Sequence, residues 1–367
     1  MERQSGAMEN VGLNMGITPE FWRDKRVLIT GHTGFKGSWL SLWLQSMGAE
    51  LSGLALAPVR PLALFDEARV GLEMVSTTGD IRNYETVLSA MASVRPEIVI
   101  HMAAQALVRR SYTEPIGTYA TNIMGTVHIL EAARQVGTVR ALVNVTTDKC
   151  YDNKEWLWGY REDDPMGGHD PYSNSKACSE MITSAYRLSY FQDSSISVAS
   201  VRAGNVIGGG DWAIDRLVPD TLRAFEIGQA VAVRNPSAIR PWQHVLEPLS
   251  GYLLLAEKLY IEGHCWAEGW NFGPQDTDVR PVQWIIEHMA EMWGDGANWK
   301  LDSDPQPHEA THLKLDISKA TTRLGWRPRW NLEEALGRII LWHQKWLAGA
   351  DMREQCLEQI KQYNETP

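Results

Sequence analysis

Residues 30–37 read Thr-Gly-His-Thr-Gly-Phe-Lys-Gly, with the three glycines spaced G-x-x-G-x-x-G. This stretch follows an apolar run at residues 26–30 and precedes a helical pattern at residues 38–47, so it predicts the turn between a strand and a helix. Glycines let the backbone of such a turn approach a pyrophosphate, and the helix N-terminus offers free N–H groups and a positive dipole end. The stretch therefore predicts a dinucleotide-binding loop.

The sequence on both sides of this loop alternates short apolar runs with helix-like segments. This alternation is typical of a parallel sheet whose two faces are covered by helices. It predicts an α/β fold built on a Rossmann-type doubly wound parallel sheet. The strands are expected at residues 26–30, 51–56, 98–102, 141–145 and 197–201.

The pattern changes after about Val206, where glycines, isolated prolines and many tryptophans predict a smaller C-terminal α/β substrate-binding lobe. An amphipathic stretch at residues 332–346 predicts its closing helix. Part of residues 240–262 is also expected to belong to the N-terminal Rossmann domain. The expected parts are a disordered leader at 1–18, an NAD-binding Rossmann domain at 19–204, a mainly substrate-binding lobe at 205–350 and a C-terminal tail at 351–367.

The composition excludes several classes of partner. A net charge of −10 over 367 residues would repel a polyanion, so no nucleic-acid partner is expected. The four cysteines lie far apart without metal-ligand spacing, so we expect no metal site, no disulfide framework and a reducing, cytoplasmic location. No apolar run approaches the roughly 18 residues of a membrane span, and no membrane association is expected.

A tyrosine and a lysine four residues apart, Tyr172 and Lys176, share one face at the expected start of a helix. A tyrosine acts as a base only if nearby positive charge favours its phenolate, because its ordinary pKa is about 10. Lys176 and a nicotinamide ring would provide that charge. The expected strand at 141–145 runs into Thr147 and Asp148 at the carboxyl edge, where open α/β sheets place their ligands. These signals together predict an oxidoreductive active site.

Longer motifs carry a resemblance to a known family. Besides residues 30–37, they comprise Ala-Ala-Gln-Ala-Leu-Val-Arg at 103–109, Thr-Asn at 121–122, Arg-Ala-Gly-Asn-Val-Ile-Gly-Gly-Gly-Asp-Trp at 202–212 and Arg-Pro-Trp-Gln-His-Val at 240–245. With them the chain resembles the extended short-chain dehydrogenase/reductase family of nucleotide-sugar enzymes from about Phe21 to Trp346. The likeness is greatest to its 4,6-dehydratases.

The resemblance implies roles for five residues. Thr147, Tyr172 and Lys176 would oxidise the sugar at C4, and Asp148 and Lys149 would eliminate water across C5 and C6. Related hexose dehydratases usually carry Thr-Asp-Glu where this chain has Thr-Asp-Lys, so the identity of the C5 base stays open. A structural ion pair between Lys149 and Asp148 is the alternative.

The resemblance further implies NAD as cofactor, CDP-glucose as substrate and a homodimer or homotetramer. The residues alone leave NAD and NADP open, because no acidic residue ends the second expected strand. The expected cofactor-binding residues are Gly31, His32, Thr33, Gly34, Phe35, Lys36, Gly37, Asp80, Ile81, Ala103, Ala104, Gln105, Asn122, Tyr172 and Lys176. The expected substrate-binding residues are Arg109, Asn205, Asp211, Trp212, Arg234, Arg240 and Asn271.

Two other functions fit parts of these patterns. A nucleotide-sugar 4-epimerase shares the fold, the glycine loop and the Tyr-x-x-x-Lys spacing. It has no use for an acid at C6, however, so Asp148 favours the dehydratase. A non-catalytic NAD(P)-sensing regulator is the third reading, and the presence of both Tyr172 and Lys176 argues against it.

Overall fold

The computed structural model describes residues 16–294, 296–302 and 312–367. Residues 1–15 of the expected leader lie outside this range. The last leader residue, Thr18, is tied to the protein, because its N–H donates to Glu257 at 2.9 Å.

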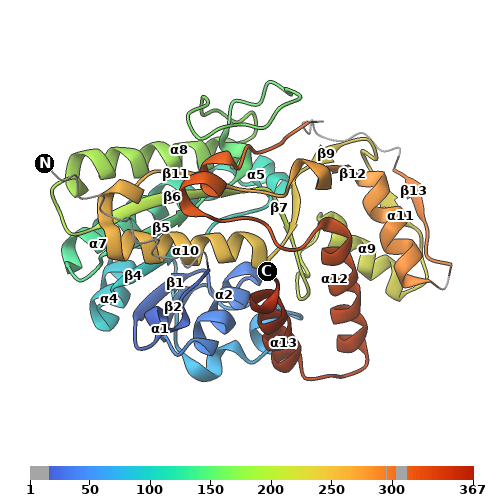
Figure 1. Cartoon of the computed structure of the whole chain (residues 1–367), viewed down its shortest axis with the longest axis horizontal. Coiled ribbons are helices and arrows are strands. Elements are labelled where there is room, and N and C mark those ends of the chain that lie inside the picture. Colours follow the sequence, from blue (N-terminus) through green and yellow to red (C-terminus); the bar gives the residue numbers. More distant parts are fainter. Residues whose placement is uncertain (1–15, 295, 303–311) are drawn as a thin grey trace, which may run out of the picture.

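The centre of the molecule is a seven-stranded sheet in which all pairs are parallel (Figure 1). Its strand order is β11-β6-β5-β4-β1-β2-β3. β2 and β3 lie on one side of β1 and the later strands lie on its other side, as in a doubly wound fold. The predicted fold class is confirmed. The strands are β1 (Arg26–Thr30), β2 (Glu50–Ala55), β3 (Val75–Thr78), β4 (Ile98–His101), β5 (Ala141–Val145), β6 (Ser197–Ala203) and β11 (Gly269–Phe272).

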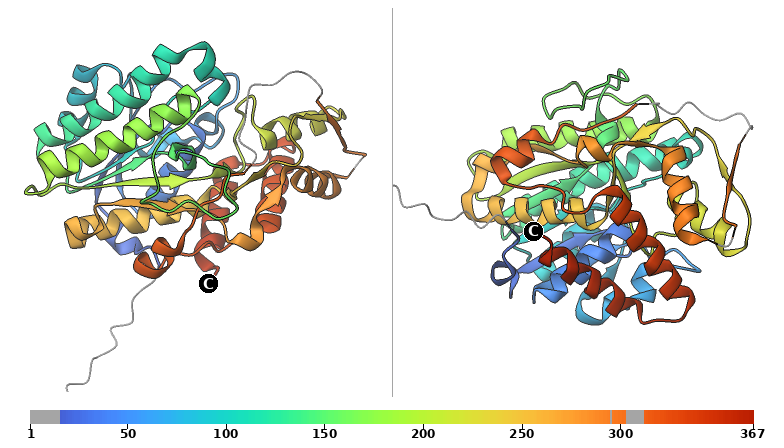
Figure 2. Two further views of the ribbon diagram at one scale, coloured as in Figure 1. Left: turned by 90° about the horizontal axis from the view of Figure 1, so that it is seen from above. Right: turned by 45° about the vertical axis from the view of Figure 1, so that its right-hand side comes forward.

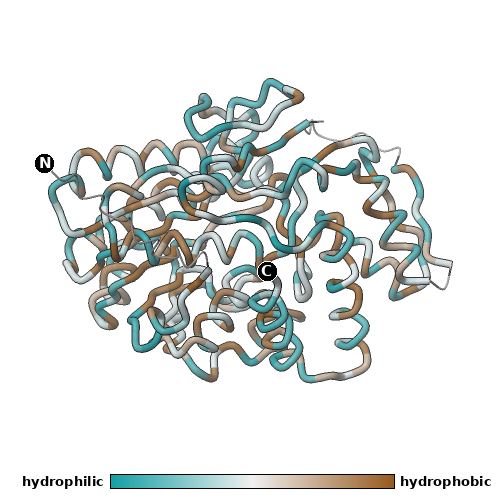
Figure 3. Tube along the Cα trace, in the orientation of Figure 1, coloured by the Kyte–Doolittle hydropathy of each residue, from teal (hydrophilic) through white to brown (hydrophobic). Residues whose placement is uncertain are grey.

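Helices cover both faces of the sheet, and the rotated views separate these layers (Figure 2). The central strands are buried along their whole length, which is why they read as continuous apolar runs (Figure 3). On one face lie α4 (Tyr84–Val94), α7 (Gly125–Val136) and α8 (Pro171–Tyr186). On the other lie α2 (Phe35–Ser46) and α10 (Leu246–Glu262).

The smaller lobe has its own apolar core. Its closing helix, α12 (Leu332–Leu347), is confirmed, and the predicted face, including Leu336, Ile339 and Ile340, is buried. The lobe's other elements are α9 (Leu217–Glu226), α11 (Val282–Trp293) and the pairs β7–β10 (Asn205–Ile207, Trp242–His244), β8–β13 (Val231–Val233, Trp299–Leu301) and β9–β12 (Ile239–Arg240, Arg280–Pro281).

One strand from the range expected as substrate lobe belongs to the main sheet. β11 pairs with β6, and α10 packs over β5 and β6, so the chain returns to the Rossmann layer after β10. The sequence pattern did not predict β11, because only four residues, Gly-Trp-Asn-Phe, enter the sheet there.

Residues 351–367 were expected as a C-terminal tail. These residues contain α13 (Met352–Glu365), which packs against α2. Its buried side chains, among them Cys356, Ile360 and Tyr363, follow helical spacing within an otherwise polar sequence, so the apolar stripe is narrow. Asp351 caps the helix by accepting from Arg353 N and Glu354 N.

No helix in the described ranges combines the length and the apolar character needed to cross a membrane.

The short helix α1 (Pro19–Trp22) is held by a buried carboxylate. Glu257 accepts from Thr18 N at 2.9 Å and from Trp22 Nε1 at 2.6 Å. Burial raises the pKa of Glu257 to about 7, although these hydrogen bonds act to lower it. Because the pKa is raised in the folded state, protonation of Glu257 contributes to the stability of the fold below about pH 4.5, and this contribution is lost as the pH rises through about 7.

We therefore expect Glu257→Gln, whose amide oxygen can still accept both bonds, to gain stability relative to the parent as the pH rises from 5 to 8. The relative gain should reach about 1–3 kcal/mol. Thermal unfolding at both pH values measures it, and the exposed Glu85→Gln controls for loss of one charge. A stability difference that does not change with pH would contradict the argument.

Candidate active site

The glycine loop joins β1 to α2 at the carboxyl edge of the sheet and leaves its backbone open. Gly31 has φ +79°, and a β-carbon there would lie 2.8 Å from the backbone nitrogen of Ala103. A β-carbon on Gly37 would lie 2.1 Å from the carbonyl oxygen of Gly31. Helix α2 begins after Gly34 with no side-chain cap and no acidic residue in its first turn. Such a cradle fits the pyrophosphate of a dinucleotide.

Not every side chain of the loop points to this cradle. The His32 ring is fully buried against β2, where it fills the space over Gly53, and its Nε2 lies 2.7 Å from Ser76 Oγ. Burial lowers the pKa of His32 to about 4, so the ring is neutral. Thr33 Oγ1 donates to Leu56 O, and Phe35 packs close to Gly208. His32 therefore contributes only its backbone to the cradle.

Residues 103–105 lie next to the glycine loop, and the side chain of Asn122 holds their backbone in place. Asn122 Oδ1 accepts from Gln105 N at 2.9 Å, and Asn122 Nδ2 donates to Gln105 O at 3.0 Å. The same amide nitrogen donates to Ser175 Oγ at 2.8 Å. The fully buried Asn122 thus links this loop, which contains Ala104, to helix α8.

The turn after β5 places a buried carboxyl group at the same edge. Thr147 leads into the short helix η3 (Asp148–Cys150), and its Oγ1 donates to Asp148 Oδ1 at 3.0 Å. Asp148 is 1% exposed, and its Oδ2 has no hydrogen-bond partner in the part of the chain that the structure describes. Burial raises the pKa of Asp148, although Lys149, Thr147 and Arg240 act in the opposite direction.

Helix α8 brings the tyrosine and the lysine to this turn. Asp170 caps the helix by accepting from Ser173 N, so Tyr172 and Lys176 lie in its first two turns. The side chain of Thr147 acts to lower the pKa of Tyr172, and Lys176 Nζ donates to Val145 O at 3.0 Å. Burial raises the pKa of Tyr172 to about 12 and lowers that of Lys176 to about 8. The predicted constellation is therefore brought together.

Lys36, Tyr252 and Arg216, which sequence reasoning did not assign to this cluster, also reach it. Lys36 Nζ lies 3.4 Å from Tyr252 Oη of α10, and burial, together with the charges of Lys176 and Arg216, lowers the pKa of Lys36 to about 7. Arg216 acts electrostatically on Tyr172 and pairs with Asp211 at 2.8 Å. Lys36 was expected only as a cofactor contact, and Arg216 lies in a loop without periodic pattern.

The smaller lobe contributes polar groups from paired strands. Asn205 begins β7, and Arg240 on β9 is 6% exposed and acts electrostatically on Asp148. Arg109 on α5 (Val108–Thr113) forms an ion pair with Asp215 at 3.2 Å, which links the Rossmann domain to the loop before α9. Of these residues, Arg240 reaches the cluster through its electrostatic action on Asp148.

Other expected site residues have different surroundings. The Asn271 side chain is fully buried: it accepts from Tyr151 Oη and donates to Tyr160 O and Asp316 O. Both hydrogens of its amide nitrogen are therefore used within the protein, and its expected contact with substrate stays a prediction.

Trp212 packs its ring against Trp342 and Trp346. Asp80 accepts three hydrogen bonds from Arg82, while Ile81 is buried against Gly125. Arg234 follows β8 in the smaller lobe.

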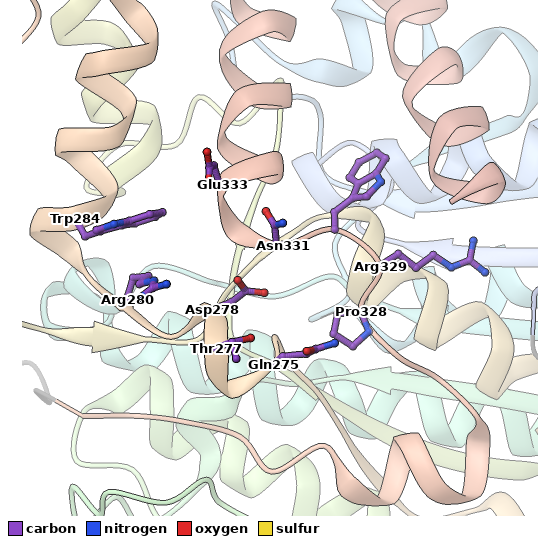
Figure 4. Close-up of a pocket in the computed structure, with 10 residues that line it drawn as sticks. Gln275, Thr277, Asp278, Arg280, Trp284, Pro328, Arg329, Asn331 and Glu333 are labelled. Carbon is purple, nitrogen blue, oxygen red and sulfur yellow. The ribbon is translucent and has the colours of Figure 1, made fainter. Parts of the chain in front are cut away.

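A separate cavity of about 370 Å³ opens between the loop after β11 and the start of α12 (Figure 4). Arg280, Trp284 and Asp278 line one side, and Arg329 and Asn331 line the other. None of the expected site residues lines it. In the described residues, no group of three or more His, Cys, Asp or Glu side chains is placed to hold a metal ion.

Comparison with known proteins identifies the family. A family model described as GDP-mannose 4,6 dehydratase matches residues 28–339. The chain belongs to this dehydratase family. Within it, the chain is 58% identical to the CDP-glucose 4,6-dehydratase of Salmonella typhimurium, covering 95% of this chain and 98% of that protein. It is also 30% identical to a dTDP-glucose 4,6-dehydratase of Streptomyces antibioticus, over 72% of this chain and 75% of that one.

Solved structures of nucleotide-sugar enzymes share the fold of this dehydratase-family chain. A UDP-glucose 4-epimerase from Thermotoga maritima superimposes with a TM-score of 0.77 at 23% identity, over 88% of this chain and 99% of that one. A dTDP-glucose 4,6-dehydratase from Streptomyces venezuelae, solved with NAD bound, gives 0.75 at 23% identity, over 89% and 99%. At this identity the likeness shows the fold alone.

Proposed function

We propose that this chain is an NAD-dependent hydro-lyase that converts CDP-D-glucose to CDP-4-dehydro-6-deoxy-D-glucose and water. The observation that carries the proposal is the buried Asp148 carboxyl group beside Thr147 and Tyr172. Oxidation and reduction at C4 alone have no use for such an acid, whereas loss of the C6 hydroxyl as water requires one. The choice of CDP-glucose rests on the 58% identity to the Salmonella enzyme.

The cofactor cradle fits NAD. The backbone of Gly31, Gly34 and Gly37 and the uncapped start of α2 would hold the pyrophosphate, with Ala103 facing them. When bound, NAD supplies the reversible two-electron oxidation and reduction of the sugar and is regenerated in each turnover. The NAD-bound dehydratase from Streptomyces venezuelae, which has the same fold, supports this choice over NADP.

Tyr172 would accept the proton of the C4 hydroxyl group. Its buried phenol has a raised pKa, so the phenolate forms only where positive charge compensates it. Arg216 provides such charge, and Lys176, one helical turn away, would add to it. Thr147, whose side chain acts on Tyr172, would orient the same C4 oxygen.

Asp148 would donate a proton to the leaving C6 hydroxyl group. Burial raises its pKa, which favours the protonated carboxyl group that an acid requires, and Oδ2 is not used by any described residue. Lys149, on the same turn, is our candidate for the base that removes the C5 proton, and the neutral amine is the form that would accept it. Lys149 acts electrostatically on Asp148, so the two groups are close.

Arg240, Asn205 and Arg109 would bind the nucleoside diphosphate from the smaller-lobe side. A guanidinium presents a fork of donors suited to phosphate oxygens, and Arg240 is positioned near the acid. We further propose a homodimer or homotetramer in the cytoplasm. The free state of all four cysteines is compatible with a reducing compartment.

Isotope routing tests the reaction. In deuterated water, the product from CDP-glucose should carry one solvent deuterium at C5, and a deuterium placed at C4 should be recovered at C6. Asp148→Asn keeps the shape but cannot donate a carboxylic proton, so dehydration should fall by about 10²–10⁴-fold while C4 oxidation continues. Absorbance of reduced NAD on the enzyme should then rise. Tyr172→Phe, the matched control, should block oxidation and show no such rise.

An epimerase would behave differently in the same experiment. The C4 label would return to C4 with inverted configuration, and Asp148→Asn would turn over normally. That result would replace the dehydratase with the epimerase. Parallel incubations with CDP-, dTDP-, UDP- and GDP-glucose identify the base, and preference for a base other than cytosine would refute that part of the proposal.

The glycine cradle predicts a specific loss of NAD binding. Gly37→Ala places a methyl group against Gly31 O, so we expect NAD affinity to fall about tenfold or more because the turn must open. Gly337→Ala in α12, where the new methyl group meets only Met292 Sδ at 3.9 Å, is the matched control. Calorimetric titration with NAD measures both. Unaltered affinity in a folded Gly37→Ala protein would remove the cofactor assignment.

Arg240 predicts a loss of substrate affinity. Arg240→Ala should weaken binding of CDP-glucose by roughly 1.5–3 kcal/mol if the guanidinium contacts the diphosphate. Arg280 lies directly opposite on β12 and is exposed, so Arg280→Ala is the matched control. Normal affinity combined with a lower melting temperature for Arg240→Ala would instead assign a structural role.

A further inference from the structure

Behind the active site lies a buried ion pair between Glu180 of α8 and Arg202 of β6. Arg202 Nε and Nη2 each lie 3.0 Å from a Glu180 oxygen, and both side chains are about 95% buried. Burial raises the pKa of Glu180, but Arg202, Ser200 and Thr146 together hold it below its ordinary value. The pair is therefore charged, and its remaining hydrogen-bonding capacity must be satisfied by neighbours.

Ser200 Oγ donates to Glu180 Oε2 at 2.5 Å, and Arg202 Nη1 donates to Glu162 O at 2.9 Å. Two further neighbours flank the catalytic turn. Before the turn, Thr146 Oγ1 donates to Glu180 Oε1 at 2.5 Å. After it, Arg202 Nη1 donates to Tyr151 Oη at 2.7 Å. Residues 147–150, including Thr147, Asp148 and Lys149, are thus fixed at both ends by one ion pair. Glu180 also lies one turn beyond Lys176 on the same helix.

The network continues to the residue that was expected at the substrate. Tyr151 Oη donates to Asn271 Oδ1 at 2.7 Å, and Asn271 Nδ2 donates to Tyr160 O at 2.8 Å, so β11 holds the loop after the catalytic turn. A β-carbon on Gly269 of β11 would lie 2.6 Å from Arg202 Nη2. The absence of a side chain at Gly269 therefore leaves the space that the guanidinium fills.

We propose that the Glu180–Arg202 pair, acting through Thr146 and Tyr151, positions the carboxyl group of Asp148 relative to Tyr172 and Lys176. These four are positioning residues, since none of them touches the reacting atoms. The inference rests on the proposed dehydratase function. Loosening the turn at either end moves the acid relative to the tyrosine, whereas Tyr172 and Lys176 keep their places on α8. The elimination of water should therefore be affected more than the oxidation at C4.

Tyr151→Phe tests the far end of the turn, because it removes one oxygen and keeps the ring stacked on Tyr160. We expect kcat for dehydration to fall about tenfold or more, KM for CDP-glucose to change less than about twofold and reduced NAD to accumulate during turnover. Tyr363→Phe is the matched control. It removes an equally buried hydroxyl group that donates to Glu247 at 2.7 Å, far from the turn, and should lower the melting temperature without changing kcat.

Variants of Thr146 test the start of the catalytic turn, and they still test the proposal if Tyr151→Phe does not fold. Thr146→Val removes the hydroxyl group that bonds Glu180 and should reproduce the loss of kcat with accumulation of reduced NAD, while Thr146→Ser should restore both. Folded variants with lower melting temperatures but normal kcat would overturn the proposal and leave a purely structural network. If the parent chain itself dehydrates no nucleoside-diphosphate glucose, the proposed function fails instead, so the two failures are distinguishable.

Discussion

The backbone N–H and C=O groups of the central strands β4, β5 and β6 lie out of reach of water, because helices cover both faces of the sheet, and each must be paired with a neighbouring strand. Strands pair in parallel only if a crossover segment carries the chain from the end of one strand back to the edge of the sheet where the next strand begins. All strands therefore end at one edge. The glycine loop after β1, the segment after β4 and the turn after β5 meet there although the first and the last of them are more than a hundred residues apart in sequence.

That constraint explains which parts of the fold and of the site could be predicted from the sequence alone. Strands such as Ala141–Val145 are apolar on both sides, so they could be predicted with nearly correct ends, and the loops that follow them could be assigned to one site. Tyr172, Lys176 and Thr147 were predicted to meet, and they do. Spacing and resemblance together were sufficient for these residues, since each lies at a strand end or a helix start.

The sequence reveals less about contacts between residues distant in the chain. Asn271 was expected at the substrate, and its amide also bonds Tyr151, Tyr160 and Asp316, partners that no local pattern reveals. Arg216 was missed because its loop has no periodicity. Residues 351–367, expected as a tail, contain α13, whose apolar stripe contacts α2 some three hundred residues earlier.

The site also reconciles an acidic chain with an anionic ligand. Lys36, Lys176, Arg216 and Arg240 act on the groups of the site, while the carboxylates that give the chain its net charge of −10 are mostly elsewhere. The local electrostatic field, rather than the total charge of the chain, governs binding of a small anion at such a site. Burial of a cation is costly, and the lowered pKa of Lys36 reflects that cost.

The packing of α13 has a consequence for synthesis of the protein. Tyr363 contacts Trp43 of α2 with ring centroids 5.5 Å apart and donates a hydrogen bond to Glu247 of α10. The first helix of the nucleotide-binding fold is thus covered in part by a helix that follows it some three hundred residues later in the chain. The contacts between α2 and α13 can form only after Met352–Glu365 have been translated, so the N-terminal domain completes its packing late.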